Sequence, residues 1–473
     1  MSRPADRPLL ITAAHAFVGG ELNLAHAAGT YIPADIYHRL AQYFGVPARF
    51  ATGIDVHGRL AEREGRRRGV PPAELATESA ERFGAGLAAL GVEPTSFLRT
   101  DDPRLLPLLP PAFENLASAG MIARGPSTSW FCRRCDLAIT KSEVEVMVGA
   151  ETRPLKKHDG PDDEPDPEAL RCTLCGGAEV EVRNSEQWRM TLPRTDELRS
   201  IAARQVPGVR RQLAGVLEGD FTEWEFTRER YYGLPMPLQP DTSLYLWNDS
   251  LFSKVALLGA TEEEVAGSLR SARLVCFFGK NILHYYGLIL PTLLRYGFGT
   301  PEPDLLFSAR GFCLTARTDV PLDVREAVDR YGRDELRFCC AYAAFDDIQD
   351  FALQEERFEL VRSSVLRGAF ERYFHRAAGL PAGGTIREDP AADALLRTLR
   401  SHFEQGGVRR ILLALEEFAR GETRRPARPG GTDGGGAARR RAELALGVLS
   451  CYMPDRFRDL PLTRRRADGS PWT

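Results

Sequence analysis

Residues 8–17 read PLLITAAHAF, residues 18–43 continue as VGGELNLAHAAGTYIPADIYHRLAQY, and residues 48–52 read ARFAT. The first stretch is a short apolar run, which predicts a buried strand. The Gly19-Gly20 pair predicts a turn, the residues up to Tyr43 predict a helix, and residues 48–52 predict a second strand. Strand, turn, helix and strand in this order indicate an α/β fold.

The rest of the chain extends this pattern. Residues 72–91 predict another helix, and strands are expected again at 243–247 and 273–278, each followed by a helix. From Phe351 onward the apolar spacing is helical, interrupted by an Arg/Pro/Gly-rich segment that is typical of a flexible linker.

Composition narrows the class of protein. The 473 residues are 43% hydrophobic and 27% charged, which is typical of a globular protein with a sizeable core. The net charge of -3 provides no global attraction for nucleic acid. Because no apolar run is long enough for a membrane span and no signal peptide precedes the first strand, we expect a cytoplasmic protein without a membrane partner.

Four of the nine cysteines form two CxxC pairs, Cys132/Cys135 and Cys172/Cys175. Two such pairs supply four thiolates for a tetrahedral structural zinc site. The alternative is four cysteines without a ligand. A closed site of four thiolates leaves no open coordination position, so we assign it a structural role only.

Several blocks of sequence, in order, resemble the class I methionyl-tRNA synthetase family. The first are AAHAFVGGELNLAHAAGTYIPADIYHRL at 13–40 and FATGIDVHG at 50–58, similar to that family's HIGH-type tetrapeptide and G-x-D-x-H-G loop. The later blocks are GDFTEWEFTRERYYGLPMP (219–237), SLYLWNDSLFSK (243–254), VCFFGKNILHYYGLILPTLL (275–294) and RYGRDELRFCCAYAAFDDIQDFAL (330–353). Together they make the resemblance specific.

The resemblance implies a class I Rossmann-type, nucleotidyl-transferase-like catalytic core with a zinc-binding insertion and a C-terminal α-helical bundle. We expect the first half of the core at 1–125, the insertion at 126–190 and the second half of the core at 191–305. A connecting segment at 306–350 would stand in place of the family's KMSKS loop. The bundle at 351–473 would resemble an anticodon-binding domain, with a flexible linker at 424–441.

The ATP end of the family's site is altered in this chain. The tetrapeptide reads Asn23-Leu24-Ala25-His26, so that the first histidine and the glycine that admits adenine are replaced. No lysine follows Gly311 where the KMSKS loop is expected, and Arg317 is the cation there that could substitute. The resemblance assigns catalysis to His26, Asn23, Lys280 and Arg317, and ATP binding to Ala25, His26, Gly279, Lys280 and Asn281. Either adenylation is weakened or lost, or these substitutes carry it, with Mg²⁺ accompanying ATP.

The amino-acid end is kept. By resemblance, Asp55 receives the ammonium group, Trp247 and Phe17 form walls, and Arg228 lies near the carboxylate. The alternative for Asp55 is a structural ion pair.

The subsite for the side chain differs from the family pattern, because His15, Lys254 and Tyr286 replace an apolar residue, a tyrosine and a histidine. Lysine occurs at only five positions in the chain, and a buried ammonium without a partner is costly. His15 and Lys254 would therefore suit an acidic substrate side chain, unless Lys254 points to solvent.

The helical stretch RSSVLRGAFERYFHRAAGL (362–380) contains no asparagine of the kind with which the family reads an anticodon, so specific tRNA binding is not expected. We expect an ATP-dependent amino-acid ligase whose acceptor is a small molecule or a separate cupin-type partner protein, as in hydrazine-forming natural-product biosynthesis by related synthetase-like proteins. The alternatives are a catalytically inactive paralogue that binds an amino acid or acts as a scaffold, and a divergent methionine–tRNA ligase.

Overall fold

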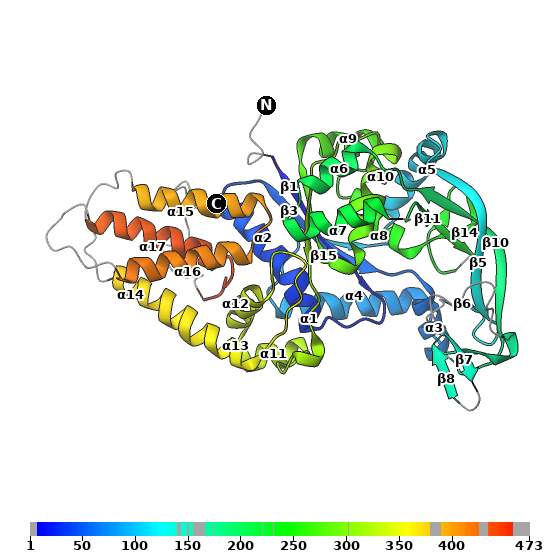
Figure 1. The fold of residues 1–473 in the computed structure, drawn as a ribbon, viewed down its shortest axis with the longest axis horizontal. Helices are drawn as coiled ribbons and strands as arrows, with labels where there is room; N and C mark the ends of the chain where they lie inside the picture. Colours follow the sequence, from blue (N-terminus) through cyan, green and yellow to red (C-terminus); the bar gives the residue numbers. More distant parts are fainter. Residues whose placement is uncertain are drawn as a thin grey trace.

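The structure is a computed structural model. It describes residues 7–139, 143–148, 151–154, 166–173, 175–219, 221–229, 231–300, 302–378, 389–424 and 434–456. Figure 1 shows an elongated molecule, with an α/β core in the middle, the long ribbon of β5 and β10 at one end and a bundle of helices at the other.

A parallel sheet forms the core. Its strands are β1 (Leu9–Ala13), β2 (Ala16–Phe17), β3 (Ala48–Asp55), β4 (Ser96–Arg99), β15 (Arg273–Gly279) and β16 (Leu305–Arg310). The strand order across the sheet begins β16, β15, β1, β3. On its other side, β3 pairs with β4, and the short strand β2 pairs with the end of β3 beyond β1. The chain therefore reverses its direction of progress across the sheet between β1 and β15, which is where doubly wound folds bind ligands.

Alternate residues of the central strands enter two different cores. Ile11 and Phe277 pack with helix α2 (Ile32–Tyr43) and the C-terminal helices, whereas Leu10 and Phe278 pack on the other face. This division follows from the period of two in a strand. The second face is covered by α6 (Asp196–Ala203), α7 (Pro207–Glu218) and α10 (Leu290–Thr292).

The insertion is a long antiparallel ribbon of β5 (Ile122–Cys132) and β10 (Val180–Thr191), flanked by β6 (Leu137–Ile139) and β11 (Glu223–Glu225). A smaller sheet of β7 (Val144–Val148), β8 (Glu151–Pro154) and β9 (Leu170–Cys172) lies at its end. The two cysteine pairs meet where the ribbon joins the smaller sheet, because Cys132 ends β5 and Cys172 ends β9.

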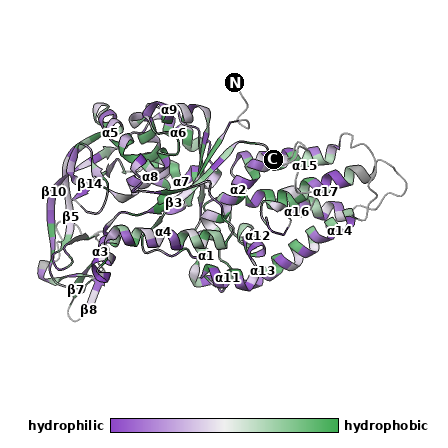
Figure 2. Cartoon of the chain, turned by 180° about the vertical axis from the view of Figure 1, so that it is seen from behind, coloured by the Kyte–Doolittle hydropathy of each residue, from purple (hydrophilic) through white to green (hydrophobic). Residues whose placement is uncertain are grey.

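The bundle consists of amphipathic helices. It includes α14 (Arg372–Ala378), α15 (Pro390–Glu404), α16 (Arg409–Arg424) and α17 (Gly434–Ser450). Figure 2 shows these helices banded in hydrophobic and hydrophilic colours. Among the described residues, every helix is too short or too polar to span a lipid bilayer.

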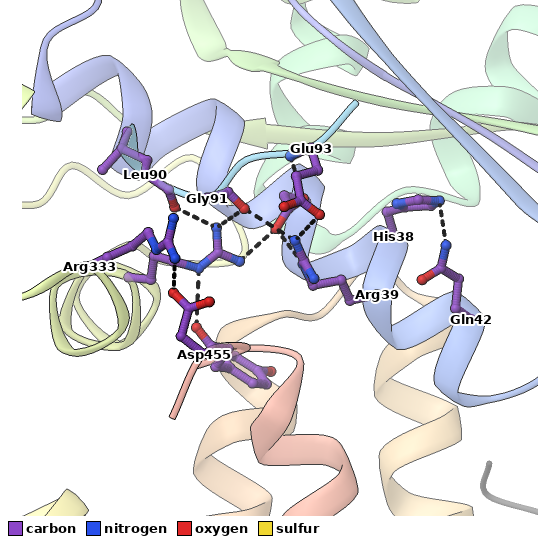
Figure 3. Close-up of polar contacts among 11 residues, drawn as sticks. His38, Arg39, Gln42, Leu90, Gly91, Glu93, Arg333 and Asp455 are labelled. Carbon is purple, nitrogen blue, oxygen red and sulfur yellow. Dashed lines mark hydrogen bonds and ion pairs between the residues drawn. The ribbon is translucent and has the colours of Figure 1, made fainter. Parts of the chain in front are cut away.

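A buried ion network joins the core to the bundle (Figure 3). The Arg337 side chain of α12 (Arg333–Ala343) donates to Asp35 Oδ2 on α2 at 2.6 Å and to the Tyr452 carbonyl at 3.2 Å. Arg39 donates to the same Asp35 oxygen at 2.8 Å. Burial opposes ionisation of Asp35, but Arg337 and Arg39 hold the pKa of its carboxyl below its usual value.

One strand lies earlier in the chain than the sequence predicted, and two elements lie across expected domain boundaries. The strand expected at 243–247 is β14 (Gln239–Leu244), and Trp247 lies in helix α8 (Leu246–Val255). Strand β16 begins at the end of the range expected for the core and continues past it, because its six residues are all buried beside β15. Helix α17 begins inside the expected linker 424–441, since Ala437 to Arg441 are good helix formers; residues 425–433 lie outside the described residues.

Candidate active site

A cavity of about 650 Å³ lies at the carboxyl ends of the central strands. It is lined by residues at or just beyond the ends of β1, β3, β15 and β16, including His15, Asp55, Gly279 and Gly311. Its volume is typical of a site for a small molecule. The position at the reversal point of the sheet and the volume together make this cavity the candidate active site.

At one end of the cavity, Asp55 ends β3 and accepts a hydrogen bond from His15 Nδ1 at 3.0 Å. The His15 side chain is fully buried, and burial together with the nearby Lys254 charge lowers the pKa of His15 to about 4. His15 is therefore neutral at pH 7, with its proton on Nδ1. Its Nε2 atom is buried and has no hydrogen-bond partner among the described residues. The imidazole fixes the orientation of the Asp55 carboxylate.

A second histidine–carboxylate pair lies beside the first. His57 Nδ1 is 2.9 Å from Asp249 Oδ2, and burial raises the pKa of the Asp249 carboxyl to about 7. After His57, Gly58 adopts a φ of 112°, a conformation that favours glycine, and the chain turns into helix α3 (Arg59–Arg68). This turn places Asp55 and the first residues of α3 around the same cavity.

Aromatic side chains form the walls at this end. Trp247 packs edge-to-face on Tyr285 with ring centroids 4.8 Å apart, and Tyr286 stacks on Phe278 at 4.0 Å. Phe17 also lines the cavity and is 53% exposed. The expected amino-acid residues His15, Phe17, Asp55, Trp247 and Tyr286 thus lie together around one cavity.

Lys254 and Arg228 lie outside the lining. Lys254 is 1% exposed, and its Nζ donates to Ser250 Oγ at 2.7 Å and to the Ser250 carbonyl at 3.0 Å. Burial lowers the pKa of Lys254 to about 8, although the Asp55 charge acts in the opposite direction. Ser250 itself lines the cavity, so the ammonium group stands directly behind the wall. Arg228 forms an ion pair with Glu225 and packs over the Tyr245 ring.

The other end of the cavity is the start of a long helix, composed of α1 (Leu24–His26), a π-type turn (Ala27–Tyr31) and α2. Asn23 caps it, because its Oδ1 accepts from His26 N at 2.9 Å. Asn23, Ala25 and His26 all line the cavity, and burial lowers the pKa of His26. A helix N-terminus of this kind favours an anion.

Two expected cations of this end lie outside the lining. Lys280 Nζ is 2.6 Å from Asp350 Oδ1, which also accepts from Phe312 N at 2.7 Å. Arg317 is exposed in a short turn, Thr315–Arg317. Gly279 and Asn281, on either side of Lys280, do line the cavity.

Sequence reasoning missed three cations that line the cavity. Arg310 is buried at the end of β16 and lies 3.0 Å from Asp346, and Arg59 and Arg63 come from α3. A charged residue at the end of the apolar strand LLFSAR was the available signal for Arg310. For Arg59 and Arg63 no signal separated them from the other arginines of α3.

The four cysteines of the insertion form one cluster, with their sulfur atoms within 4.8 Å of one another. Cys132 Sγ lies 3.6 Å from Cys175 Sγ, and Cys135 Sγ lies 4.0 Å from Cys172 Sγ. A tetrahedral zinc ion with Zn–S bonds of about 2.3 Å separates its sulfurs by about 3.8 Å. The cluster therefore fits a zinc ion, for which all four thiolates would be ligands.

Comparisons with known proteins agree with this geometry. The family model for tRNA synthetases class I (M) matches residues 9–378. The methionine–tRNA ligase of Thermosynechococcus vestitus is 27% identical over 329 residues, covering 66% of this chain and 58% of that protein. The corresponding ligase of Myxococcus xanthus is 25% identical over 456 residues, covering 87% and 63%. The chain thus spans about three fifths of the length of these relatives.

A solved structure has the same fold. Mycobacterium tuberculosis methionyl-tRNA synthetase bound by methionyl-adenylate superposes with a TM-score of 0.70 and 18% identity, covering 98% of both chains.

Proposed function

Because this chain belongs to the class I methionyl-tRNA synthetase family, we propose that it binds an α-amino acid and ATP in one cavity and joins them as an aminoacyl adenylate. One observation carries this proposal. The cavity is continuous from Asp55 and Trp247 at one end to Asn23 and His26 at the other. A carboxylate and an anion-favouring helix N-terminus in the same cavity suit the two ends of an aminoacyl adenylate.

At the amino-acid end, Asp55 receives the substrate ammonium group. The neutral His15 imidazole donates to one carboxylate oxygen of Asp55 and leaves the other oxygen for the substrate. Trp247 and Tyr286 pack against the side chain. This arrangement positions the substrate carboxylate toward the start of α1.

At the nucleotide end, a carboxylate oxygen of the amino acid attacks the α-phosphorus of ATP. The bond from that phosphorus to the bridging oxygen breaks, and pyrophosphate leaves with the negative charge. The dipole of the helix that begins at Leu24, with the side chains of Asn23 and His26, stabilises the developing charge, while the N–H groups of Leu24 and His26 already donate to the Leu322 carbonyl and to Asn23 Oδ1. Arg310 lies at the cavity, and Lys280 and Arg317 are the substitutes for the absent lysines if the Gly311 loop moves when ATP binds. Mg²⁺ would enter with ATP and neutralise part of the phosphate charge.

The wall beneath the side-chain subsite favours an acidic amino acid. Lys254 cannot contact the substrate directly from its position, but its ammonium donates to Ser250 Oγ, and the Ser250 hydroxyl can then donate into the cavity. The positive charge behind the wall favours a carboxylate in front of it. Glutamate or aspartate therefore suits this subsite better than methionine.

The acceptor in this proposal is a small molecule rather than tRNA. The lysine-free loop after Gly311 and the absence of asparagine from residues 362–380 support it. The acceptor's nucleophile would attack the adenylate carbonyl and release AMP.

Amino-acid-dependent exchange between ATP and pyrophosphate tests the proposal. We expect exchange with glutamate or aspartate, a rise of about tenfold or more in the KM for the amino acid in Asp55→Asn, and a fall of about 10²–10³-fold in kcat in His26→Ala. Arg67→Gln, on the solvent side of α3, is the control. An absence of exchange with all twenty amino acids, in protein that still binds one of them, would instead support the inactive amino-acid-binding alternative.

A further inference from the structure

Two arginines of helix α3 line the candidate active site without a hydrogen-bond or ion-pair partner among the described residues. Arg59 and Arg63 are one turn apart, so they lie on the same face of the helix. No hydrogen bond or ion pair joins either guanidinium group to any residue that the structure describes. The other three arginines of the helix are all paired: Arg66 with the Cys135 carbonyl, Arg67 with Glu64, and Arg68 with Glu78.

Burial makes it costly for Arg59 to have no partner in the described part of the chain. The side chain is partly buried, and burial lowers the pKa of Arg59, although the charge of Glu143 acts in the opposite direction. Glu21 and Glu143 also line the cavity, but among the described residues neither forms an ion pair with Arg59 or Arg63. A desolvated guanidinium group is stabilised by an anion that accepts two of its hydrogen bonds.

Arg59 is surrounded by groups that do not belong to the ATP end of the cavity. The groups that act on its charge are Glu143 of the insertion and Tyr245, Arg228 and Tyr231 around strands β12 (Thr227–Glu229) and β14. None of them belongs to the α1 end that holds Asn23 and His26. Helix α3 begins at Arg59 without a side-chain cap, and its N-terminus also favours an anion.

We propose that Arg59 and Arg63 form an anion subsite that binds a carboxylate or phosphate group of the acceptor. That the anion belongs to an acceptor rests on the proposed function, whereas the anion subsite itself does not. The two guanidinium groups would hold the anionic end of a small molecule at the side of the cavity next to the amino acid. Its nucleophile could then reach the activated carbonyl while its charge stays on α3.

Ligand-observed NMR titration tests the subsite without any catalytic step. The protein is first saturated with glutamate, so that Asp55 is occupied, and is then titrated with propionate, propyl phosphate and uncharged 1-propanol. We expect the wild type to bind at least one of the two anions, and Arg59→Gln with Arg63→Gln to bind it about tenfold more weakly or worse. Arg67→Gln, the same substitution on the solvent side of the helix, should bind like the wild type.

The outcomes separate the possible ligands. Stronger binding of propionate than of propyl phosphate assigns a carboxylate, and the reverse assigns a phosphate. Equal anion binding by the wild type and the double variant, or no anion binding by the wild type, would overturn the subsite. Loss of binding to an oligonucleotide ending in CCA, with anion binding unchanged, would assign the arginines to RNA and also overturn it.

Exchange between ATP and pyrophosphate separates this subsite from the proposed function. The KM for pyrophosphate in the double variant should stay within about threefold of the wild type, because its arginines serve the acceptor. A tenfold rise in the KM for pyrophosphate would place the arginines at the nucleotide and contradict the subsite. If the wild type shows no exchange but the anion titration succeeds, the subsite stands and the adenylation proposal fails.

Discussion

We propose that Lys254, a buried residue, sets substrate preference without touching the substrate. Its ammonium group donates to Ser250 Oγ at 2.7 Å, and Ser250 forms the wall of the cavity. A charge behind a polar wall still favours an opposite charge in front of it, because the surrounding protein screens it less than water does.

Substituting Lys254 by methionine should reduce the preference for acidic amino acids. We expect the ratio of glutamate to methionine affinity to fall by about 10-fold or more, the value of one charge-assisted hydrogen bond. Ser250→Ala should lower the same ratio, since it removes the hydroxyl that faces the cavity. Calorimetry with both amino acids measures the ratio, and Ser271→Ala, on an exposed helix surface, is the control. A ratio unchanged in both Lys254→Met and Ser250→Ala would contradict this account.

The same preference should depend on pH. Since the pKa of Lys254 is about 8, the side chain is mostly charged at pH 7 and mostly neutral at pH 9. The charged form favours glutamate, so the ratio of glutamate to methionine affinity should fall as the pH rises from 7 to 9. Both ligands carry the same α-amino group, whose titration cancels in the ratio. A ratio that stays constant or rises would show that Lys254 has no part in selection.

The sequence identified some residues of the site but not how each of them is oriented. The resemblance placed His15, Asp55 and Trp247 by their positions in known blocks, and these residues line one cavity. It did not show that Ser250 separates Lys254 from the cavity, because the rotamer of a lysine is decided by packing rather than by spacing. Arg59 and Arg310 are absent from the family blocks, and only the fold reveals that they face the same cavity.

At the scale of elements, the strands of the core were easier to predict than their ends. Residues 273–278 predicted β15 well, because a continuous apolar run between helices has few alternatives. The strand predicted around Trp247 was wrong, since an aromatic-rich stretch suits a strand and a buried helix equally. The spacing of the cysteines predicted a cluster that the ribbon of β5 and β10 brings together.

The insertion should depend on zinc for its stability. We expect one zinc ion per chain in the purified protein, bound by Cys132, Cys135, Cys172 and Cys175. Cys172→Ser should lose this zinc and make residues 126–190 sensitive to protease, while the α/β core keeps its melting transition, because the metal stabilises the structure locally. Elemental analysis and limited proteolysis measure both effects, with Cys313→Ser as the control. Protein that holds no zinc after washing with a chelator would refute the site.

At the scale of the whole molecule, Arg337 connects the core to the bundle, because it pairs with Asp35 on α2 and donates to the Tyr452 carbonyl. Arg337→Met should destabilise the protein by about 3–5 kcal/mol, since it leaves the buried Asp35 with one cation fewer. Arg439→Met, which breaks an exposed pair with Glu443, should cost about 0.5 kcal/mol or less. Denaturant unfolding compares the two variants. Equal stabilities of the two variants would show that the Asp35–Arg337 pair contributes little to the free energy of unfolding.

Acid should weaken the pair of Asp35 and Arg337. The pKa of Asp35 is lower in the folded than in the unfolded chain, so its ionised form contributes stability above the unfolded value of about 3.9. That contribution is lost as the pH falls below this value and through the folded pKa. Arg337→Met should therefore lose less stability than the wild type between pH 5 and pH 3. A larger loss of stability in the variant than in the wild type over this pH range would contradict the prediction.

The whole chain should fail to charge tRNA with methionine at a useful rate. No lysine follows Gly311, Asn23 replaces the first histidine of the HIGH-type tetrapeptide, and residues 362–380 carry no asparagine. A filter assay with bulk tRNA and radiolabelled methionine tests this, with a methionyl-tRNA synthetase as the positive control. Efficient charging would favour the divergent methionine–tRNA ligase.

The most direct test of the central claim is mass spectrometry of the protein incubated with ATP, Mg²⁺ and glutamate or aspartate, quenched without an acceptor. The account predicts a bound species with the mass of the aminoacyl adenylate, together with pyrophosphate, and the loss of that species in His26→Ala. ATP recovered unchanged with every amino acid, from protein that binds both ATP and the amino acid, would contradict it.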